Sequence, residues 1–162
     1  MSRPPHNTAT NRHASPAGLT QAAWAGFLYF SAIFALGFGF GVLRTLALEA
    51  FPKLTRLGAV LVEIPVILAL AWMVCGVLVA RLPLTGGERS AVVMGAFALA
   101  LLLAAEAGLS VGLNGLSLQE HLALYRQPSH GIGLAGQCIF AILPWVRIRY
   151  FSPPARRLQT KP

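Results

Sequence analysis

A long apolar run that contains a single carboxylate constrains this chain more than any other feature. Residues 57–80 carry one charged side chain, Glu63, and a proline follows two positions later, Pro65. A run of about 20 apolar residues is long enough to cross a bilayer as a helix. An ionisable group inside such a helix is costly and is rarely turned toward lipid. The sequence therefore predicts a membrane-spanning helix in which Glu63 meets polar groups from other helices.

Three further runs have the same apolar character, and the composition agrees with them. Charged residues make up 11% of the 162 residues, whereas soluble domains carry about 25%. The predicted spans, which together form one transmembrane domain over 22–146, are 22–48, 57–80, 90–113 and 131–146. The predicted fold class is therefore all-α, an integral membrane bundle of four transmembrane helices with a short interfacial helix between the third and the fourth.

The segments outside the spans are short or polar. Ser117 and Glu120 have the spacing of a capping box, which predicts the start of an interfacial helix over about 117–126. We expect Tyr125, near the end of this helix, to lie at the depth of the lipid headgroups. Residues 1–21 are rich in Pro and polar residues, and residues 147–162 are basic and contain Pro, so both are predicted to be disordered tails.

The net charge of +8 comes from basic residues that flank the spans instead of lining one helix face. This distribution is typical of membrane anchors, so we expect no binding to nucleic acid. With four spans both termini lie on one side of the membrane, and that side collects nine Lys and Arg residues against four on the other. The positive-inside rule then predicts that both termini are cytoplasmic.

Each span brings one polar side chain to a similar depth near the opposite, non-cytoplasmic side. In the second, third and fourth spans this residue lies about 9–10 Å from the end of the helix, at 1.5 Å per residue. We predict one polar intramembrane cluster with these members: Arg44, Glu63, Glu106 and Gln137. The cluster has two interpretations, an Arg–Glu contact that fixes the register of the helices, or a site for a proton or a ligand.

Two pairs of glycines are predicted to pack helices together. Gly37 and Gly41 are four residues apart in the first span, a spacing that lets membrane helices approach closely. Gly133 and Gly136 belong to a Gly-x-Gly-x-x-Gly pattern that has the letters of a dinucleotide-binding fingerprint. That fingerprint needs a preceding strand, whereas this pattern opens a predicted span, so we interpret it as helix packing.

Nothing in the sequence predicts catalytic residues, a metal site or a cofactor. The histidines, which are His6, His13, His121 and His130, lie outside the predicted spans and lack the spacing of a metal site. No serine is set beside a His and an Asp in a way that favours nucleophilic catalysis. The expected partners are the lipid bilayer and either a second copy of the chain or another membrane protein.

Several local patterns resemble a recurrent set of uncharacterised bacterial four-span inner-membrane proteins. The patterns, over about residues 24–147, are Gly39-Phe-Gly41-x-x-Arg44, Glu63-Ile-Pro65, Ala105-Glu106 and Gly136-Gln137. The resemblance implies a fold and a location in the bacterial inner membrane, and it brings no activity.

A second pattern is similar to part of a motif in four-span enzymes that use glutathione. Arg56 stands seven residues before Glu63, and a proline follows, but Val60 occupies the position of an asparagine in those enzymes. This similarity implies an enzyme alternative that would bind a small molecule near Arg56 and Glu63.

The sequence thus predicts a small structural or accessory component of the inner membrane, whose biochemical activity it does not specify. The first alternative is a proton-linked small transporter or channel subunit that uses Glu63 and Glu106. The second is the membrane enzyme that binds a small molecule.

Overall fold

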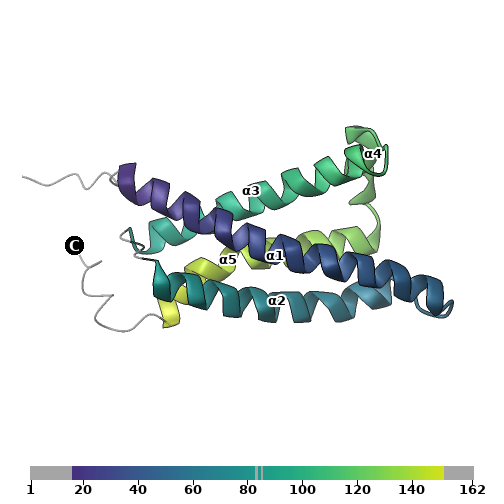
Figure 1. Cartoon of the computed structure of the whole chain (residues 1–162), viewed down its shortest axis with the longest axis horizontal. Coiled ribbons are helices and arrows are strands. Elements are labelled where there is room, and N and C mark those ends of the chain that lie inside the picture. The colour runs from purple at the N-terminus through teal and green to yellow at the C-terminus, as the bar shows by residue number, and fades with distance from the viewer. Residues whose placement is uncertain (1–15, 83, 85, 152–162) are drawn as a thin grey trace, which may run out of the picture.

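The computed structural model describes residues 16–82, 84 and 86–151, so most of the predicted tails, 1–15 and 152–162, lie outside the described residues. The described chain forms five helices, which are α1 (Pro16–Ala50), α2 (Arg56–Arg81), α3 (Glu88–Gly112), α4 (Leu118–Leu124) and α5 (Pro128–Phe151). Four of them are long, and α4 is a short helix at one end of the bundle (Figure 1). The long helices are apolar enough to cross a membrane. The predicted fold class is therefore confirmed.

Two helices extend beyond the spans that we predicted. α1 begins at Pro16, where the sequence predicted a tail up to residue 21. Proline suits the first position of a helix because its missing N–H would have no partner there. α5 has 24 residues, which is about 36 Å at helical rise, in place of the 16-residue span predicted over 131–146. Its last turns include residues 147–151, where the sequence predicts the start of a disordered C-terminal tail.

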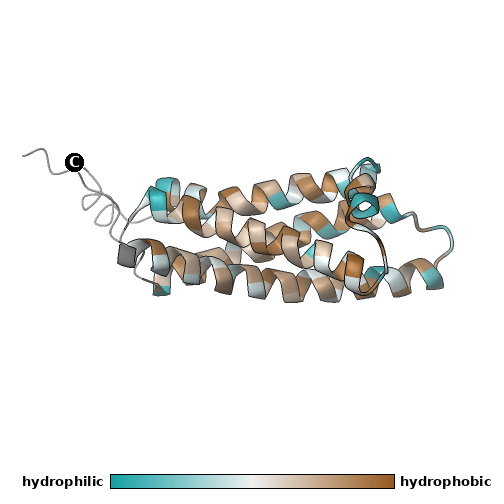
Figure 2. Ribbon diagram, turned by 90° about the horizontal axis from the view of Figure 1, so that it is seen from above, coloured by the Kyte–Doolittle hydropathy of each residue, from teal (hydrophilic) through white to brown (hydrophobic). Residues whose placement is uncertain are grey.

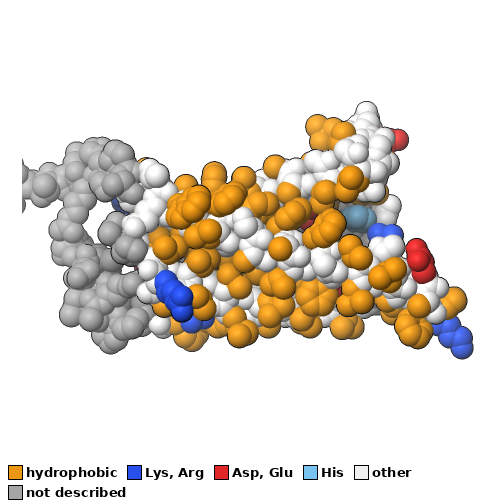
Figure 3. All heavy atoms as spheres, in the orientation of Figure 1, with side chains coloured by type: hydrophobic (Ala, Val, Ile, Leu, Met, Phe, Trp, Pro, Cys, Tyr) orange, Lys and Arg blue, Asp and Glu red, His pale blue; other side chains and the backbone are white. Residues whose placement is uncertain are grey.

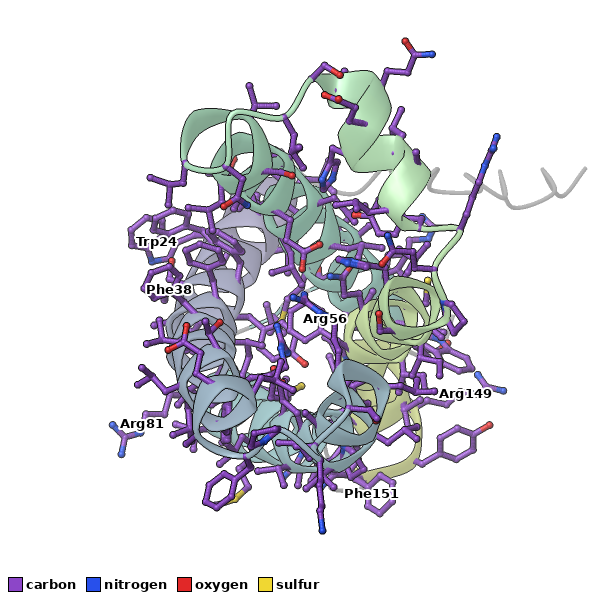
Figure 4. The ribbon with its side chains drawn as sticks, turned by 90° about the vertical axis from the view of Figure 1, so that its right-hand side faces the viewer. Trp24, Phe38, Arg56, Arg81, Arg149 and Phe151 are labelled. Carbon is purple, nitrogen blue, oxygen red and sulfur yellow. The ribbon has the colours of Figure 1, made fainter. Side chains whose placement is uncertain are left out.

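The four long helices form a ring in which each contacts two neighbours. α1 packs against α2 and α3, and α5 packs against the same two helices on the opposite side. The order around the ring is therefore α1, α2, α5 and α3, which is visible when the bundle is viewed from its end (Figure 4). The described chain enters and leaves at the same end of the bundle, opposite α4 (Figure 1). We call this the terminal end and the other the α4 end.

The terminal half of the bundle is tightly packed. Tyr29 of α1 is fully buried, its hydroxyl donates to the carbonyl oxygen of Phe140 at 3.2 Å, and the two rings stack at 4.3 Å. Two glycines allow backbones to touch: a Cβ on Gly26 would lie 2.6 Å from the carbonyl oxygen of Met94, and one on Gly95 would collide with that of Ala141. The core of this half is thus closed by direct approach of α1 to α3 and of α3 to α5.

Two arginines hold the last turns of α5 in place. The Arg147 guanidinium lies 4.7 Å from the centre of the Trp72 ring and donates to the Trp72 carbonyl oxygen at 3.3 Å. Arg149 forms an ion pair with Glu88 at 2.8 Å, and the Trp145 indole N–H donates to the same carboxylate at 3.0 Å. These partners explain why the basic segment after residue 146 continues the helix.

The outer surface of the bundle is an apolar belt. Along the four long helices the surface is largely hydrophobic, and charged side chains gather toward the two ends (Figures 2 and 3). Val62, Met73 and Leu43 are 71%, 64% and 59% exposed, as expected for side chains that face lipid.

The capping box that starts α4 is present as predicted. The Ser117 hydroxyl accepts from the Glu120 backbone N–H at 3.2 Å, and the Glu120 carboxylate accepts from the Ser117 N–H at 2.7 Å. The side of α4 that faces the protein carries His121, which is buried, whereas Leu122 is 58% exposed. Tyr125, which we expected at headgroup depth, turns toward Glu106 of α3.

The close contact at Gly95 predicts a large difference between two glycine substitutions in one helix. Gly95→Ala places its Cβ against backbone of α5, which cannot move away as a side chain can, so we expect a loss of about 1–3 kcal/mol in the free energy of unfolding. Gly108→Ala meets no atom within 4 Å and should leave stability unchanged or slightly higher. Unfolding in mixed micelles measures both variants, and equal stabilities would contradict the predicted contact.

The capping box predicts a pH dependence of α4. Hydrogen bonds from the Ser117 hydroxyl and backbone N–H lower the pKa of the exposed Glu120 carboxyl. Because the pKa is lower in the folded helix, this stabilisation is present above the unfolded pKa, about 4.3, and is lost as the pH falls through the folded one. Amide exchange over 118–124, corrected for intrinsic rates, should therefore lose protection in acid. Glu120→Ala should remove this change, and an identical profile in that variant would refute the assignment.

Candidate functional site

The half of the bundle toward α4 encloses a cavity of about 520 Å³. This volume lies within the range of roughly 300–1,000 Å³ that is usual for small-molecule sites. Side chains from all four long helices and from the α4 segment line it. Seen from the α4 end, the cavity lies in the middle of the ring of helices (Figure 4).

The first polar pair in the cavity joins α1 to α2. Arg44 forms an ion pair with Glu63, and the two side chains are 26% and 13% exposed. Arg44 can reach Glu63 because α1 continues as a helix to Ala50, so that the arginine lies within the helix and not at its exit. Each charge is thereby neutralised at a depth where an isolated charge would be costly.

The second polar pair joins α3 to α5. The Gln137 side-chain amide donates to Glu106, and the Tyr125 hydroxyl donates to the other oxygen of that carboxylate at 3.4 Å. The Tyr125 hydroxyl also lies 3.5 Å from Nε2 of His121, in the preceding turn. Burial, together with the nearby Glu106 carboxylate, raises the pKa of Tyr125, so this hydroxyl stays protonated and remains a donor at neutral pH.

The four predicted cluster residues all line the same cavity, but as two pairs. One pair lies on the α1–α2 side of the ring and the other on the α3–α5 side. Within the described chain, no hydrogen bond or ion pair joins Arg44 or Glu63 to Glu106. In place of a single cluster, the four residues therefore form two pairs on opposite sides of the cavity.

The mouth of the cavity carries Arg56, which the sequence singled out for the enzyme alternative alone, and His130, which it did not assign to this site. Arg56, at the first position of α2, is exposed and lies over the opening (Figure 4). His130, from α5, also lines the cavity and lies in the electrostatic field of Arg56, Arg44, His121 and Glu106. The spacing of His121 and Tyr125, four residues apart on one face of a helix, was the signal for an inward polar face on α4.

The cavity has an apolar floor toward the middle of the bundle. The lining residues nearest the terminal half are Ile33, Ile67, Leu68, Leu102 and Phe140. Beyond them lies the packed core around Tyr29 and Met94, both fully buried. The cavity is therefore closed on the terminal side in this conformation.

All four glycines that we predicted to pack helices line the cavity. Gly37, Gly41 and Gly133 line the cavity, and a Cβ on Gly37 or Gly133 would meet no atom within 4 Å. Gly136 does face a neighbouring helix, because its Cβ would lie 3.3 Å from Ile64 of α2. For Gly37 and Gly41, packing against a separate chain stays a prediction.

The cavity also opens sideways between α1 and α3. Phe38, Val42 and Leu113 line the cavity and are also 51%, 48% and 72% exposed, so the cavity continues to the outer surface there. In the space-filling view a histidine is visible in a hollow beside α1, near the α3–α4 corner (Figure 3). The surface around this side opening is apolar, so the opening faces lipid when the protein lies in a membrane.

The lining carries few charged side chains, which are Arg44, Arg56, Glu63 and Glu106. In the part of the chain that the structure describes, no group of three or more His, Cys, Asp or Glu residues could hold a metal ion.

Comparison with known proteins gives no match, either among family models, among curated proteins or among solved structures.

The Arg44–Glu63 ion pair predicts strong coupling between two substitutions. Arg44→Met and Glu63→Gln each leave a charge without its partner inside the bundle, so each should destabilise the fold. The double variant should recover part of the loss, with a coupling of roughly 0.5–3 kcal/mol in a double-mutant cycle of unfolding free energies. Additive losses would mean that the pair contributes nothing to stability.

Proposed function

We propose that this chain is a multi-pass protein of the bacterial inner membrane that binds a small amphipathic molecule in the cavity at its α4 end. The observation that carries the proposal is the cavity itself, which has an apolar floor, polar walls and an opening in the apolar belt. Ligand sites typically combine such apolar surface with a few placed polar groups. An amphipathic molecule fits both parts of this lining.

A purely structural role accounts for less of the geometry. An Arg–Glu contact that only fixed helix register would need no empty space beside it. Here Gly37 and Gly133 line the cavity, and a Cβ on either would meet no atom within 4 Å, so both leave the wall free of side chains. A bundle selected for stability alone would gain from larger apolar residues at such positions, because filled cavities stabilise a fold.

The shape of the cavity favours binding over conduction. A proton-linked transporter needs polar groups through the whole membrane, whereas the cavity lining ends at apolar residues such as Ile33 and Phe140. The enzyme alternative uses the same space, since Arg56 and Glu63 both line it. That alternative adds a reaction to the binding step proposed here.

The proposed orientation puts the cavity mouth on the periplasmic side. The loops and helix ends at the α4 end carry Lys53, Arg56 and Arg126, and the excess of basic residues belongs to the opposite side when the whole sequence is counted. With both termini cytoplasmic, a ligand reaches the cavity from the periplasm or from the outer leaflet.

Filling the cavity tests the proposed function. The Cβ of Gly37→Leu has no neighbouring atom within 4 Å, and the rest of the side chain enters the cavity, so the fold should persist and binding should fall at least about tenfold, a loss of about 1.4 kcal/mol. The measurement is saturable binding of the uncharged probe N-phenyl-1-naphthylamine to protein in nanodiscs, after subtraction of protein-free nanodiscs.

Gly39→Leu is the matched control. Gly39 is exposed on the same helix and does not line the cavity, and a Cβ added to it would meet no atom within 4 Å. Binding that is absent in the native protein, or that is lost equally in both variants, would reject the proposed function.

A further inference from the structure

Glu106 is a carboxylate at membrane depth without an opposite charge beside it. Its oxygens accept hydrogen bonds from the neutral Gln137 amide and the neutral Tyr125 hydroxyl. The ion pairs found in the described chain are Arg44–Glu63 and Arg149–Glu88, and neither includes it. Donors on both oxygens suit the ionised form of a carboxyl group. Glu106 is half-buried, and a carboxylate at membrane depth that has only neutral donors is costly unless a cation approaches it.

Neither arginine that lines the cavity neutralises Glu106. Arg44 is already paired with Glu63 on the opposite wall. Arg56 is exposed at the mouth, where water can solvate its charge. Because Arg44 neutralises Glu63, the carboxylate without a cation beside it is Glu106, and an anionic ligand inside the cavity would add a like charge to it.

The lining of the cavity that Glu106 faces suits an apolar cation. Four aromatic side chains line the cavity, namely Phe34, Phe38, Tyr125 and Phe140. The faces of aromatic rings attract cations, most strongly where water is excluded. We propose that the cavity binds an organic cation with an apolar body, whose charge is neutralised by Glu106. This inference rests on the binding function proposed above and names the class of ligand.

The side opening provides a route for such a ligand. An apolar cation partitions into the bilayer with its charge near the interface, and the gap beside Phe38 and Leu113 connects the cavity with that region. Entry between α1 and α3 also avoids Arg56 at the axial mouth, which would repel it (Figures 3 and 4). Glu106 lies on α3 and lines the cavity that this opening enters.

The test uses two probes that have nearly the same shape and opposite charges. Tetraphenylphosphonium and tetraphenylborate are permanent ions, so neither changes its charge with pH. We expect saturable binding of tetraphenylphosphonium to protein in nanodiscs above that to protein-free nanodiscs, and at least tenfold weaker binding of tetraphenylborate after the same correction. Glu106→Gln should weaken tetraphenylphosphonium binding at least tenfold and weaken binding of N-phenyl-1-naphthylamine by a clearly smaller factor.

Two further comparisons make the result specific. Glu49→Gln removes an exposed carboxylate near the same end of the bundle, outside the cavity, and should leave tetraphenylphosphonium binding unchanged. The variants Glu106→Asp and Glu106→Asn differ from each other in charge but hardly in size. If Glu106→Gln changes the shape of the cavity and also loses the uncharged probe, stronger tetraphenylphosphonium binding by the Asp variant than by the Asn variant supports the proposal, and equal binding rejects it.

The other outcomes separate this inference from the proposed function. If the uncharged probe binds and Gly37→Leu abolishes its binding, but tetraphenylphosphonium binding is insensitive to Glu106→Gln, the cavity is a binding site and the cation assignment is wrong. Preferential binding of tetraphenylborate would assign the site to an anionic amphiphile held by Arg56. Failure of the uncharged probe to bind would reject the proposed function itself.

Discussion

Direct contact between helix backbones at one end of the bundle determines the shape of the whole molecule. At Gly26 and Gly95 there is no Cβ, so α1 meets α3, and α3 meets α5, at backbone distance. In lipid, where water provides no hydrophobic drive between helices, such close packing is a main source of association. From this contact α1 and α3 diverge toward α4 (Figure 1). The cavity is the space that opens where they separate.

The polar side chains that line this cavity need partners for their charges and hydrogen bonds, and they find them in one another. Arg44 and Glu63 do so completely by forming an ion pair between adjacent helices. Glu106 has only the neutral donors Gln137 and Tyr125. Both acids lie on helices that pack against α1, which carries Arg44, but Arg44 pairs with Glu63 of α2, and α3 and α5 bring no lysine or arginine to this depth. The charges on the α1–α2 wall therefore neutralise each other, whereas the α3–α5 wall carries a carboxylate without a cationic partner.

The two groups of glycines illustrate how one residue type serves opposite purposes. Gly26, Gly95 and Gly136 allow neighbouring helices to approach, whereas Gly37 and Gly133 face empty space. The four-residue spacing of Gly37 and Gly41 predicted a helix contact, but that spacing only places residues on one face. Whether a second helix or a cavity lies opposite that face depends on how the helices cross, which no local pattern encodes.

The sequence alone determined the four apolar helices and the level at which their polar residues lie, because span length and the rise per residue are local properties of a helix. It also determined the start of α4, since a capping box involves residues only three positions apart. The tertiary structure decided which polar groups pair, that Tyr125 turns inward, and that α5 continues past residue 146. Those outcomes depend on contacts between helices distant in sequence, such as Arg147 with Trp72, whose energies exist only once the helices have packed.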